Sequence, residues 1–257
     1  NDVAADISAA RESVGLLPSY HFVDTCAGEF SADTPYFYSS WGEEDEGVSV
    51  GETGVLIVGS GPNRIGQGLE FDTCCTLSST AYRRRGRTTV MVNSNPETVS
   101  TDFNVSDRLY IEPLTAEDVI NVIRKERLTE VVVQLGGQTP LNMAESLQRA
   151  GARIVGTPLR GIHDAEDRDK FSALIRRLGL RQPENRMAGS AAAVRAAAEE
   201  IEYPVLLRPS FVLGGRSMTI AYNRDDLDAF LAAAPVLSED RPVLVDRFLE
   251  DAFEYDV

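Results

Sequence analysis

The sequence predicts an α/β protein in which a domain with a parallel sheet precedes a second, incomplete domain of α+β type. From Val55 onward, apolar runs alternate with amphipathic stretches, which is typical of strands and helices around a parallel sheet. A glycine-rich stretch, GPNRIGQGLEFD at residues 61–72, follows the first apolar run. After about residue 164, an alanine-rich helix precedes two apolar runs joined through a glycine pair, which indicates a different architecture.

Each predicted element of the first domain has its own boundary signal. Three arginines and a glycine end the first helix, T-A-E-D is typical of a capped helix start, and Thr139 and Pro140 suit the cap and first position of the third helix. The strands are predicted at residues 55–59, 88–95, 130–135 and 153–156. The helices are predicted at residues 72–85, 115–126 and 139–151.

The second domain begins with a helical connector, Asp164 to Leu178. It continues with the alanine-rich helix (190–200), an antiparallel hairpin across Gly214 and Gly215, a helix from about Arg224 and the strand PVLVDRF at residues 242–248. No terminal helix follows, so we expect this domain to be incomplete. Residues 1–40 contain aromatics and helix formers in no clear period, and WGEEDEGVSVGETG (41–54) is typical of a solvated acidic linker.

The glycine-rich stretch has two interpretations. A dinucleotide fingerprint requires G-x-G-x-x-G directly after a strand. Gly59 and Gly61 fit this spacing, but Arg64 occupies the third position, and the next glycines are Gly66 and Gly68. A plain strand-to-helix turn therefore remains open on local pattern alone.

Composition favours an ordinary globular protein of the cytoplasm. Of 257 residues, 43% are hydrophobic and 25% are charged, and no apolar run approaches the roughly 20 residues of a membrane span. The first residues lack a signal-peptide pattern. Cys26, Cys74 and Cys75 have no metal-ligand spacing, so we expect reduced, half-buried thiols.

The charge balance is strongly acidic, with 40 acidic and 25 basic residues and a net charge of −15. Such a surface makes nucleic acid an unfavourable partner. Only two lysines, Lys125 and Lys170, occur beside 23 arginines. GC-rich coding also replaces lysine by arginine, but it does not explain the acid excess, so the composition indicates a halophilic source.

Arginines are the chemically distinctive residues of the second domain. Arg208 ends the apolar run VLLR, where a guanidinium requires an anion, and its planar fork suits phosphate oxygens. Pairing with a protein carboxylate is the alternative. Arg168 in AEDRDKF and Arg216 in LGGRS are the other two, and the adjacent Gly214 and Gly215 permit close approach of the backbone to a phosphate.

These motifs together resemble the large chain of carbamoyl phosphate synthetase. The resemblance extends from Val55 to the C-terminus, in order and at the family's spacing, through GPNRIGQGLEFD, MVNSNPETVSTDF, DRLYIEP, GGQTPL, AEDRDKF, RPSFVLGGR and DRFLEDAFEYDV. VDTCAGEFSADTPYFYSS at residues 23–40 resembles the segment that leads into the second half of that chain. GPNRIGQG and GGQTP are similar to the second half rather than the first.

The resemblance implies a fragment with a Rossmann-like pre-ATP-grasp domain and a truncated ATP-grasp domain behind a short helical N-terminal segment. It assigns the end of a helical oligomerisation region to residues 1–40, the linker to 41–54, the pre-ATP-grasp domain to 55–163 and the start of the ATP-grasp domain to 164–257. The glycine-rich loop would then be the first turn of a pre-ATP-grasp fold without a nicotinamide site.

The resemblance also implies ATP-dependent phosphorylation of carbamate, giving carbamoyl phosphate for pyrimidine and arginine synthesis. A glutaminase small chain and the first synthetase half of the same large chain would be the partners. Magnesium or manganese would assist, with potassium as a further cation, and the metal ligands would lie beyond Val257. The implied nucleotide contacts are Arg168 and Arg208 on the phosphates, Gly214 and Gly215 in the phosphate lid, and Asp246, Leu249 and Glu254 on adenine and ribose.

Two other functions are compatible with parts of the sequence. A biotin carboxylase-like ATP-grasp ligase would share the fold and the arginines, but GPNRIGQG and VNSNPETVSTDF do not suit it. A nucleotide-binding module without catalysis is the second, because the sequence offers no general base. For either enzyme, we expect the fragment alone to be inactive.

Overall fold

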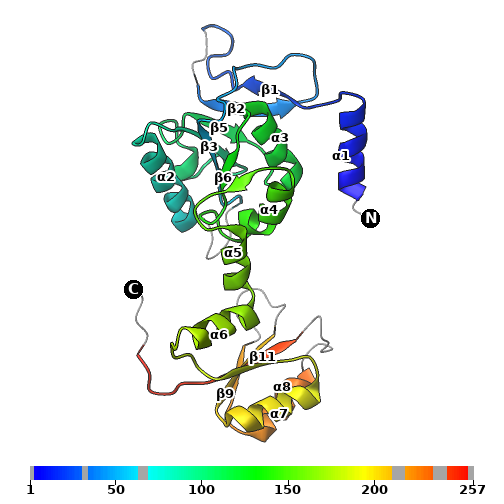
Figure 1. The fold of residues 1–257 in the computed structure, drawn as a ribbon, viewed down its shortest axis with the longest axis vertical. Helices are drawn as coiled ribbons and strands as arrows, with labels where there is room; N and C mark the ends of the chain where they lie inside the picture. Colours follow the sequence, from blue (N-terminus) through cyan, green and yellow to red (C-terminus); the bar gives the residue numbers. More distant parts are fainter. Residues whose placement is uncertain (1–2, 31–33, 63–68, 210–217, 234–241, 254–257) are drawn as a thin grey trace. The chain divides into compact units, whose positions relative to one another are not determined.

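The computed structural model describes residues 3–30, 34–62, 69–209, 218–233 and 242–253. It divides into two compact units, Asn1–Arg168 (unit 1) and Asp169–Val257 (unit 2), which are drawn in Figure 1. Four residues singled out above, Gly214, Gly215, Arg216 and Glu254, lie outside the described residues, as do residues 63–68 of the glycine-rich loop.

Unit 1 contains a seven-stranded sheet in the order β1-β2-β5-β4-β3-β6-β7. All neighbouring strands are parallel except β1, which pairs antiparallel with β2. The strands are β1 Ser19–Phe22, β2 Tyr36–Ser40, β3 Gly54–Val58, β4 Thr88–Asn93, β5 Arg108–Ile111, β6 Glu130–Val132 and β7 Arg153–Ile154. The parallel sheet and its four predicted strands are confirmed, whereas β1, β2 and β5 were not predicted.

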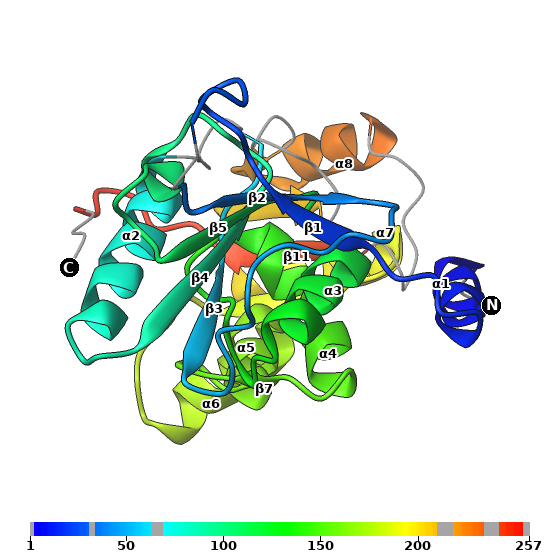
Figure 2. The same ribbon diagram turned by 90° about the horizontal axis from the view of Figure 1, so that it is seen from above.

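Helices cover both faces of this sheet, as Figures 1 and 2 show. One core contains Leu56, Val58 and Val90 of the sheet together with residues of α3 and α4. The other contains Val55, Ile57 and Met91 together with Cys75 of α2. The alternation of side chains along each strand therefore divides the apolar runs between two buried faces. The helices of unit 1 are α1 Val3–Ser13, α2 Leu69–Arg83, η1 Val99–Thr101 (3₁₀), α3 Ala116–Glu126, α4 Gln138–Arg149 and α5 Leu159–Glu166.

The predicted capping signals are partly confirmed. Thr115 caps α3, and its side chain accepts a hydrogen bond from the Asp118 amide. The start of α4 was predicted two residues too late. Gly137 is its N-cap, at φ 76° and ψ −156°, so Thr139 lies inside the first turn. Glycine adopts this conformation without the steric cost of a side chain.

Among its described residues, the N-terminal segment is helical only in α1, so the prediction of a helical segment over residues 1–40 is wrong for residues 19–22 and 36–40. Residues 19–22 and 36–40 form β1 and β2, which extend the sheet of unit 1. Tyr20 and Phe37 are buried, and their rings lie 5.2 and 5.0 Å from the ring of Tyr110 in β5. Aromatic residues at alternate positions favour a half-buried strand, and this packing outweighs the local helix propensity.

Residues 42–50, which we call the edge segment, were predicted to be part of a solvated linker. Residues 42–48 are exposed, as predicted, but the segment is not free, because Asp45 and Glu46 lie along the outer edge of β1. The Asp45 carboxylate accepts from the Tyr20 amide at 2.9 Å, the Glu46 carboxylate accepts from the Phe22 amide at 2.7 Å, and the Glu46 amide donates to the Tyr20 carbonyl at 2.8 Å. The acidic residues thus satisfy edge groups that would otherwise be open to another strand.

Unit 2 contains a four-stranded antiparallel sheet in the order β10-β9-β11-β8. Its strands are β8 Asn185–Ala188, β9 Val205–Pro209, β10 Thr219–Ala221 and β11 Val243–Arg247, and its helices are α6 Arg168–Arg177, α7 Ala191–Ile201 and α8 Arg224–Ala233. The antiparallel pairing of β9 with β10 is confirmed. Residues of α7 and α8, such as Val194 and Leu227, share one core with the sheet.

Candidate functional site

An open cleft lies at the carboxyl edge of the parallel sheet in unit 1. In the strand order, β3 lies between β4 and β6. The chain therefore adds β4 and β5 on one side of β3 and then β6 and β7 on the other side, so the direction of strand addition reverses at β3. Open α/β sheets bind ligands at such switch points. The cleft has a volume of about 540 Å³ and is lined by Pro62, Ser94, Ile111, Glu112, Pro113, Leu114 and Thr139.

A buried polar network fixes the two loops beside this cleft. Asp72 of α2 and Asn93 of β4 are both fully buried. The Asp72 carboxylate accepts from the Ser60 amide at 3.1 Å, from Asn93 Nδ2 at 3.2 Å and from Thr98 Oγ1 at 2.7 Å. Asn93 Oδ1 accepts from the Gly61 amide at 3.1 Å. One carboxylate and one amide therefore connect the loop after β3 to the loop after β4.

Gly59 makes this network possible. A Cβ atom at Gly59 would lie 2.5 Å from Asn93 Nδ2, which is closer than atoms can pack. Gly136 is restricted in the same way, because its Cβ would lie 2.6 Å from the carbonyl oxygens of both Val58 and Gly59. These glycines permit close packing between neighbouring strand ends, so their presence is explained without a bound pyrophosphate.

Glu112 is the ionisable residue of the cleft lining. It is 4% exposed, and its carboxylate accepts hydrogen bonds from the Ser39 amide and from Ser39 Oγ, the latter at 2.8 Å. Burial raises the pKa of Glu112 above its ordinary value, and the Ser39 hydrogen bonds oppose this rise. The two hydrogen bonds from Ser39 also connect β2 to the residue that follows β5. Strand β2, which was not predicted, therefore holds the Glu112 carboxylate in the cleft lining.

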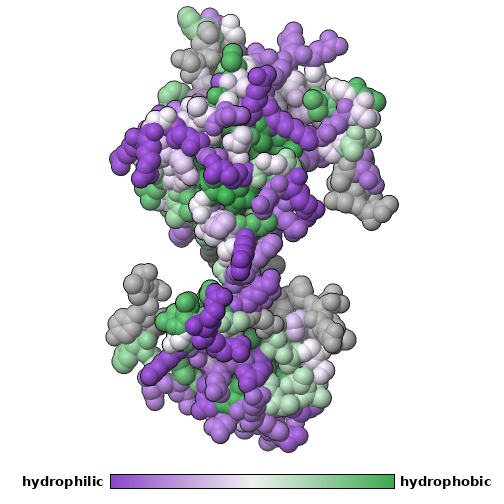
Figure 3. Space-filling model, in the orientation of Figure 1, coloured by the Kyte–Doolittle hydropathy of each residue, from purple (hydrophilic) through white to green (hydrophobic). Residues whose placement is uncertain are grey.

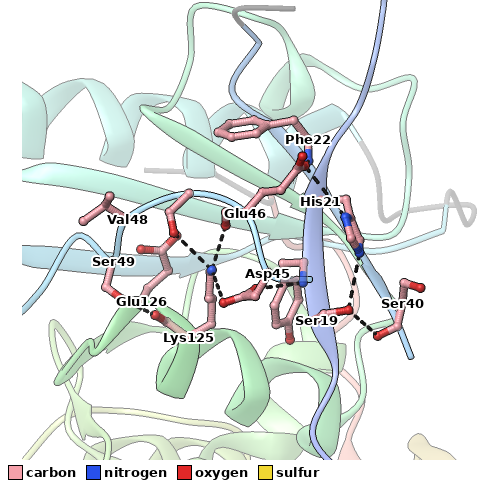
Figure 4. A network of polar contacts seen from close by, with 12 residues as sticks. Ser19, His21, Phe22, Ser40, Asp45, Glu46, Val48, Ser49, Lys125 and Glu126 are labelled. Carbon is pink, nitrogen blue, oxygen red and sulfur yellow. Dashed lines mark hydrogen bonds and ion pairs between the residues drawn. The ribbon is translucent and has the colours of Figure 1, made fainter. Parts of the chain in front are cut away.

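Lys125 joins the edge segment to the end of α3, as Figure 4 shows. Its ammonium lies 2.5 Å from Asp45 Oδ2, 2.7 Å from the Glu46 carbonyl and 3.2 Å from the Gly47 carbonyl, and its side chain is only 8% exposed. A compact ammonium with three donors matches three oxygens spread around one point.

In the same network, the side chain of a serine contacts a histidine, and that histidine contacts a glutamate. Ser19 Oγ lies 3.3 Å from His21 Nε2, and His21 Nδ1 lies 3.8 Å from Glu46 Oε2. Ser19 is 4% exposed, however, and its hydroxyl donates to the Ser40 carbonyl (Figure 4). A buried hydroxyl already donating to the backbone is no nucleophile, so this arrangement stabilises the strand edge.

In unit 2, the structure brings two of the predicted site residues together. Arg208 in β9 and Asp246 in β11 lie on neighbouring antiparallel strands, and Arg208 Nε is 2.9 Å from Asp246 Oδ2. Both atoms are buried, but the contact lacks hydrogen-bond geometry and is an ion pair. The Arg208 side chain is 43% exposed and that of Asp246 is 13% exposed. The carboxylate pairing that the sequence left open is therefore present, while the guanidinium remains accessible to an anion.

The other predicted site residues do not join this pair in the described residues. Arg168 is exposed at the first position of α6. Leu249 is 57% exposed and follows β11. Both positions are accessible to a ligand, and their proposed contacts with a nucleotide remain predictions.

The thiols are free, but their predicted burial is only partly correct. Cys26 is half-buried, Cys74 is exposed and Cys75 is buried. Burial, together with the nearby Asp72 carboxylate, raises the pKa of the Cys75 thiol. Cys74 and Cys75 differ because successive residues of α2 point to different sides of the helix, one toward solvent and one toward the sheet.

The visible surface of both units is mainly hydrophilic, as Figure 3 shows. In the part of the chain that the structure describes, no helix is both long and apolar enough to cross a membrane. Within the same described ranges, no three histidine, cysteine or acidic side chains are grouped so that they could hold a metal ion.

Two family models match consecutive parts of the chain. Residues 51–164 match the carbamoyl phosphate synthase preATP-grasp domain, and residues 167–257 match the ATP binding domain of the carbamoyl-phosphate synthase L chain. The carbamoyl phosphate synthase large chain of Gemmatimonas aurantiaca is 53% identical over 98% of this chain, and that of Archaeoglobus fulgidus is 48% identical over 100%. The chain spans 23% and 24% of these two relatives.

Solved structures of lower identity share the fold. N5-carboxyaminoimidazole ribonucleotide synthetase from Thermus thermophilus aligns with a TM-score of 0.54 at 16% identity, over 76% of this chain and 47% of its own. The biotin carboxylase domain of Hydrogenobacter thermophilus 2-oxoglutarate carboxylase, in a complex with MgADP and bicarbonate, gives 0.55 at 20% identity, over 77% and 44%. At these identities the likeness concerns the fold alone.

Proposed function

Because the chain belongs to the carbamoyl phosphate synthase large-chain family, we propose that it forms part of the half that phosphorylates carbamate with ATP. The observation that carries this proposal is an identity of 53% along 98% of the chain, in which two successive domains of that family match in order. GPNRIGQG and GGQTP, which resemble the second half, support the assignment to carbamate rather than bicarbonate. Relatives with biotin carboxylase activity share only the fold, so we favour the first assignment.

The proposed domains follow the same family. Residues 1–40 would end the oligomerisation region, and 41–54 would connect it to the pre-ATP-grasp domain at 55–163. Residues 164–257 would begin the ATP-grasp domain. The part-buried hydrogen bonds that β1, β2 and the edge segment make within unit 1 support a connection that is tighter than a free linker.

The chemical task of the residues present is to hold and neutralise phosphate oxygens, because charge spreads over them during phosphoryl transfer. Arg208 suits this role, since its guanidinium is held at Nε by Asp246 while its side chain stays partly exposed. We propose that Arg168 also contacts the phosphates and that Gly214 and Gly215 belong to the lid over them. Asp246, Leu249 and Glu254 would contact adenine and ribose.

Magnesium or manganese supplies further charge neutralisation when it is bound in enzymes of this kind. The described residues do not fit such an ion, because they offer no group of three ligating side chains. From the family resemblance, we propose that its ligands lie beyond Val257 and that potassium is a further cation. The isolated chain is accordingly expected to make no carbamoyl phosphate.

The remaining proposals concern the cellular setting. We propose a cytoplasmic enzyme of pyrimidine and arginine biosynthesis that receives ammonia from a glutaminase small chain and works with the first synthetase half. The net charge of −15 and the scarcity of lysine support a halophilic source. If this is correct, the chain melts at a higher temperature in molar KCl than in dilute buffer, whereas an unchanged or lower Tm contradicts it.

The function is tested by ATP formation from ADP and carbamoyl phosphate, using the longer large chain that contains these residues, in molar KCl with magnesium. We expect activity that Arg208→Ala reduces by about 100-fold, the order expected for one group that stabilises transferring charge. Arg195→Ala is the matched control, because Arg195 pairs with Asp228 between α7 and α8 and should leave the rate unchanged.

The ATP-formation assay, together with assays of nucleotide binding and biotin carboxylation, separates the alternatives. Folded protein that binds nucleotide without forming ATP would favour the binding module, and bicarbonate-dependent carboxylation of biotin would favour the biotin carboxylase-like enzyme. Equal rates for the two arginine variants would refute the role of Arg208 and leave the assignment of the reaction intact.

A further inference from the structure

One face of α2 has no partner among the described residues. The opposite face of α2 is packed against the sheet and the loop after β4, where Asp72, Cys75 and Ser79 are buried. The outward positions recur at helical spacing, with Leu69, Thr73, Leu77 and Ala81 all exposed. This outward side is what we call the α2 face.

The α2 face is unusual for this protein because it has no charge over its central turns. From Thr73 to Tyr82 no residue is acidic or basic, although a quarter of the chain is charged. Glu70 precedes this stretch and Arg84 follows it, so charges lie only at its two ends. An uncharged centre with charged ends is the composition of a protein interface.

The centre of the face is apolar as well as uncharged. Leu77 is 64% exposed and Leu69 is 61% exposed, and the outward position between them is Thr73, whose side chain is small. By contrast, α3 has Glu117, Asp118 and Arg124 on its accessible surface, each with a charged partner or a capping bond. Of the two helices, only α2 offers a surface that can be covered without removing a charge from water.

We propose that the α2 face packs against another segment of the longer large-chain polypeptide, one with an apolar and uncharged surface. The chain spans only 23% of its relatives' length, so about three quarters of the polypeptide is available to cover it. A segment of the same polypeptide is favoured over a second copy, because tethering gives it a high effective concentration.

The exposed Cys74 reports whether the face is covered. It lies within the uncharged stretch, and the buried Cys75 beside it serves as an internal reference. The experiment measures maleimide labelling of each cysteine by mass spectrometry, in the 257-residue chain and in the longer large chain, relative to urea-unfolded samples. We expect Cys74 to label freely in the shorter chain and about tenfold or more slowly in the longer one, where labelling requires local opening.

Three other outcomes overturn the proposal. Equal labelling of Cys74 in both polypeptides means that the face stays open. Protection in the 257-residue chain that depends on protein concentration means that a second copy covers it, and protection there without such dependence means that the chain covers its own face.

A substitution gives an independent test. We expect Leu77→Asp to lower the urea midpoint of the longer polypeptide and to restore Cys74 labelling, while Leu77→Met does neither. In the 257-residue chain Leu77→Asp should have little effect, because an exposed position tolerates charge. Gln148→Asp, at an exposed position of α4, is the matched control in the longer polypeptide. An equal shift for Leu77→Asp and Gln148→Asp contradicts the proposal.

Discussion

Arg208 Nε and Asp246 Oδ2 form an ion pair of 2.9 Å between β9 and β11. The family resemblance implies that these residues contact opposite ends of a nucleotide, Arg208 the phosphates and Asp246 the adenine and ribose. Their contact means that the two roles are coupled: the carboxylate that orients the guanidinium is itself a proposed ligand. A change at one residue therefore alters the position and the surroundings of the other.

Asp246→Asn is expected to weaken nucleotide binding more than it weakens the fold. Arg208 is partly exposed and stays solvated without its partner, so the free energy of unfolding should fall by less than about 1 kcal/mol. The Kd for ATP should rise about tenfold, because the guanidinium loses its orientation. Calorimetric titration of the longer large chain measures this, with Asp228→Asn as the control. Equal affinity for the two variants would show that the pair is structural only.

Glu126 is expected to be the most costly acidic side chain to remove from unit 1. It is fully buried and accepts from Arg108 Nη1 at 2.6 Å, from the Val50 amide at 2.8 Å and from the Tyr110 hydroxyl. Glu126→Ala leaves these donors without an acceptor and should cost about 3 to 5 kcal/mol in urea unfolding. Glu117→Ala, which breaks the exposed pair with Arg11, should cost less than about 1 kcal/mol. Similar losses of unfolding free energy for Glu126→Ala and Glu117→Ala would show that the buried network contributes no more to stability than the pair of Glu117 with Arg11.

Glu112 should make stability depend on pH with a definite sign. Burial raises its pKa in the folded protein above the ordinary 4.5, so the folded state retains a proton that the unfolded chain releases. This contribution is fully present below pH 4.5 and is lost as the pH rises through the folded value. The unfolding free energy of the wild type minus that of Glu112→Gln should therefore be larger at pH 4 than at pH 7, in urea titrations at fixed KCl. The opposite trend would show that the Ser39 hydrogen bonds outweigh burial.

Lys125 should not be replaceable by arginine, although arginine dominates the cations of this chain. The ammonium lies within 3.2 Å of three oxygens of the edge segment, and a planar guanidinium cannot reproduce that arrangement. Lys125→Arg is expected to cost about 1 to 2 kcal/mol, and hydrogen exchange at the Tyr20 and Phe22 amides should accelerate. Arg149→Lys, at an exposed i,i+4 pair in α4, should change neither measurement. A neutral Lys125→Arg variant would contradict this explanation.

The sequence predicted the parallel sheet and the antiparallel hairpin because periodic apolar runs and capping residues are local signals. It did not predict β1 and β2, whose buried aromatic residues Tyr20 and Phe37 pack on Tyr110, which lies 90 and 73 residues later in the chain. It assigned the edge segment to solvent, where residues 42–48 are exposed, but it missed the contacts of this segment with β1. Acidic residues are typical of linkers, and only the folded chain shows that Asp45 and Glu46 bind the amides of a strand edge.

The candidate site was predictable in its residue types and not in its pairings. An arginine at the end of an apolar run requires an anion, and the sequence left a phosphate and a carboxylate open. Asp246 supplies the carboxylate because antiparallel register places β11 beside β9, a relation that no local pattern contains. Asp72 and Asn93 were missed as a network, although a charged residue in register with Cys75 and Ser79 on the inner side of α2 was an available signal.

The parallel pairing of β2 with β5 has a consequence for synthesis on the ribosome. Phe37 pairs with Tyr110, so a strand made early must wait for one that is made more than 70 residues later. At about 5 to 20 residues per second, translation leaves β2 paired with β1 but without β5 for roughly 4 to 15 s. During that interval Tyr20 and Phe37 are exposed on a two-stranded ribbon that is only marginally stable. The nascent chain is therefore most vulnerable to aggregation before residue 111 emerges, and a chaperone that binds aromatic segments would act on residues 19–40.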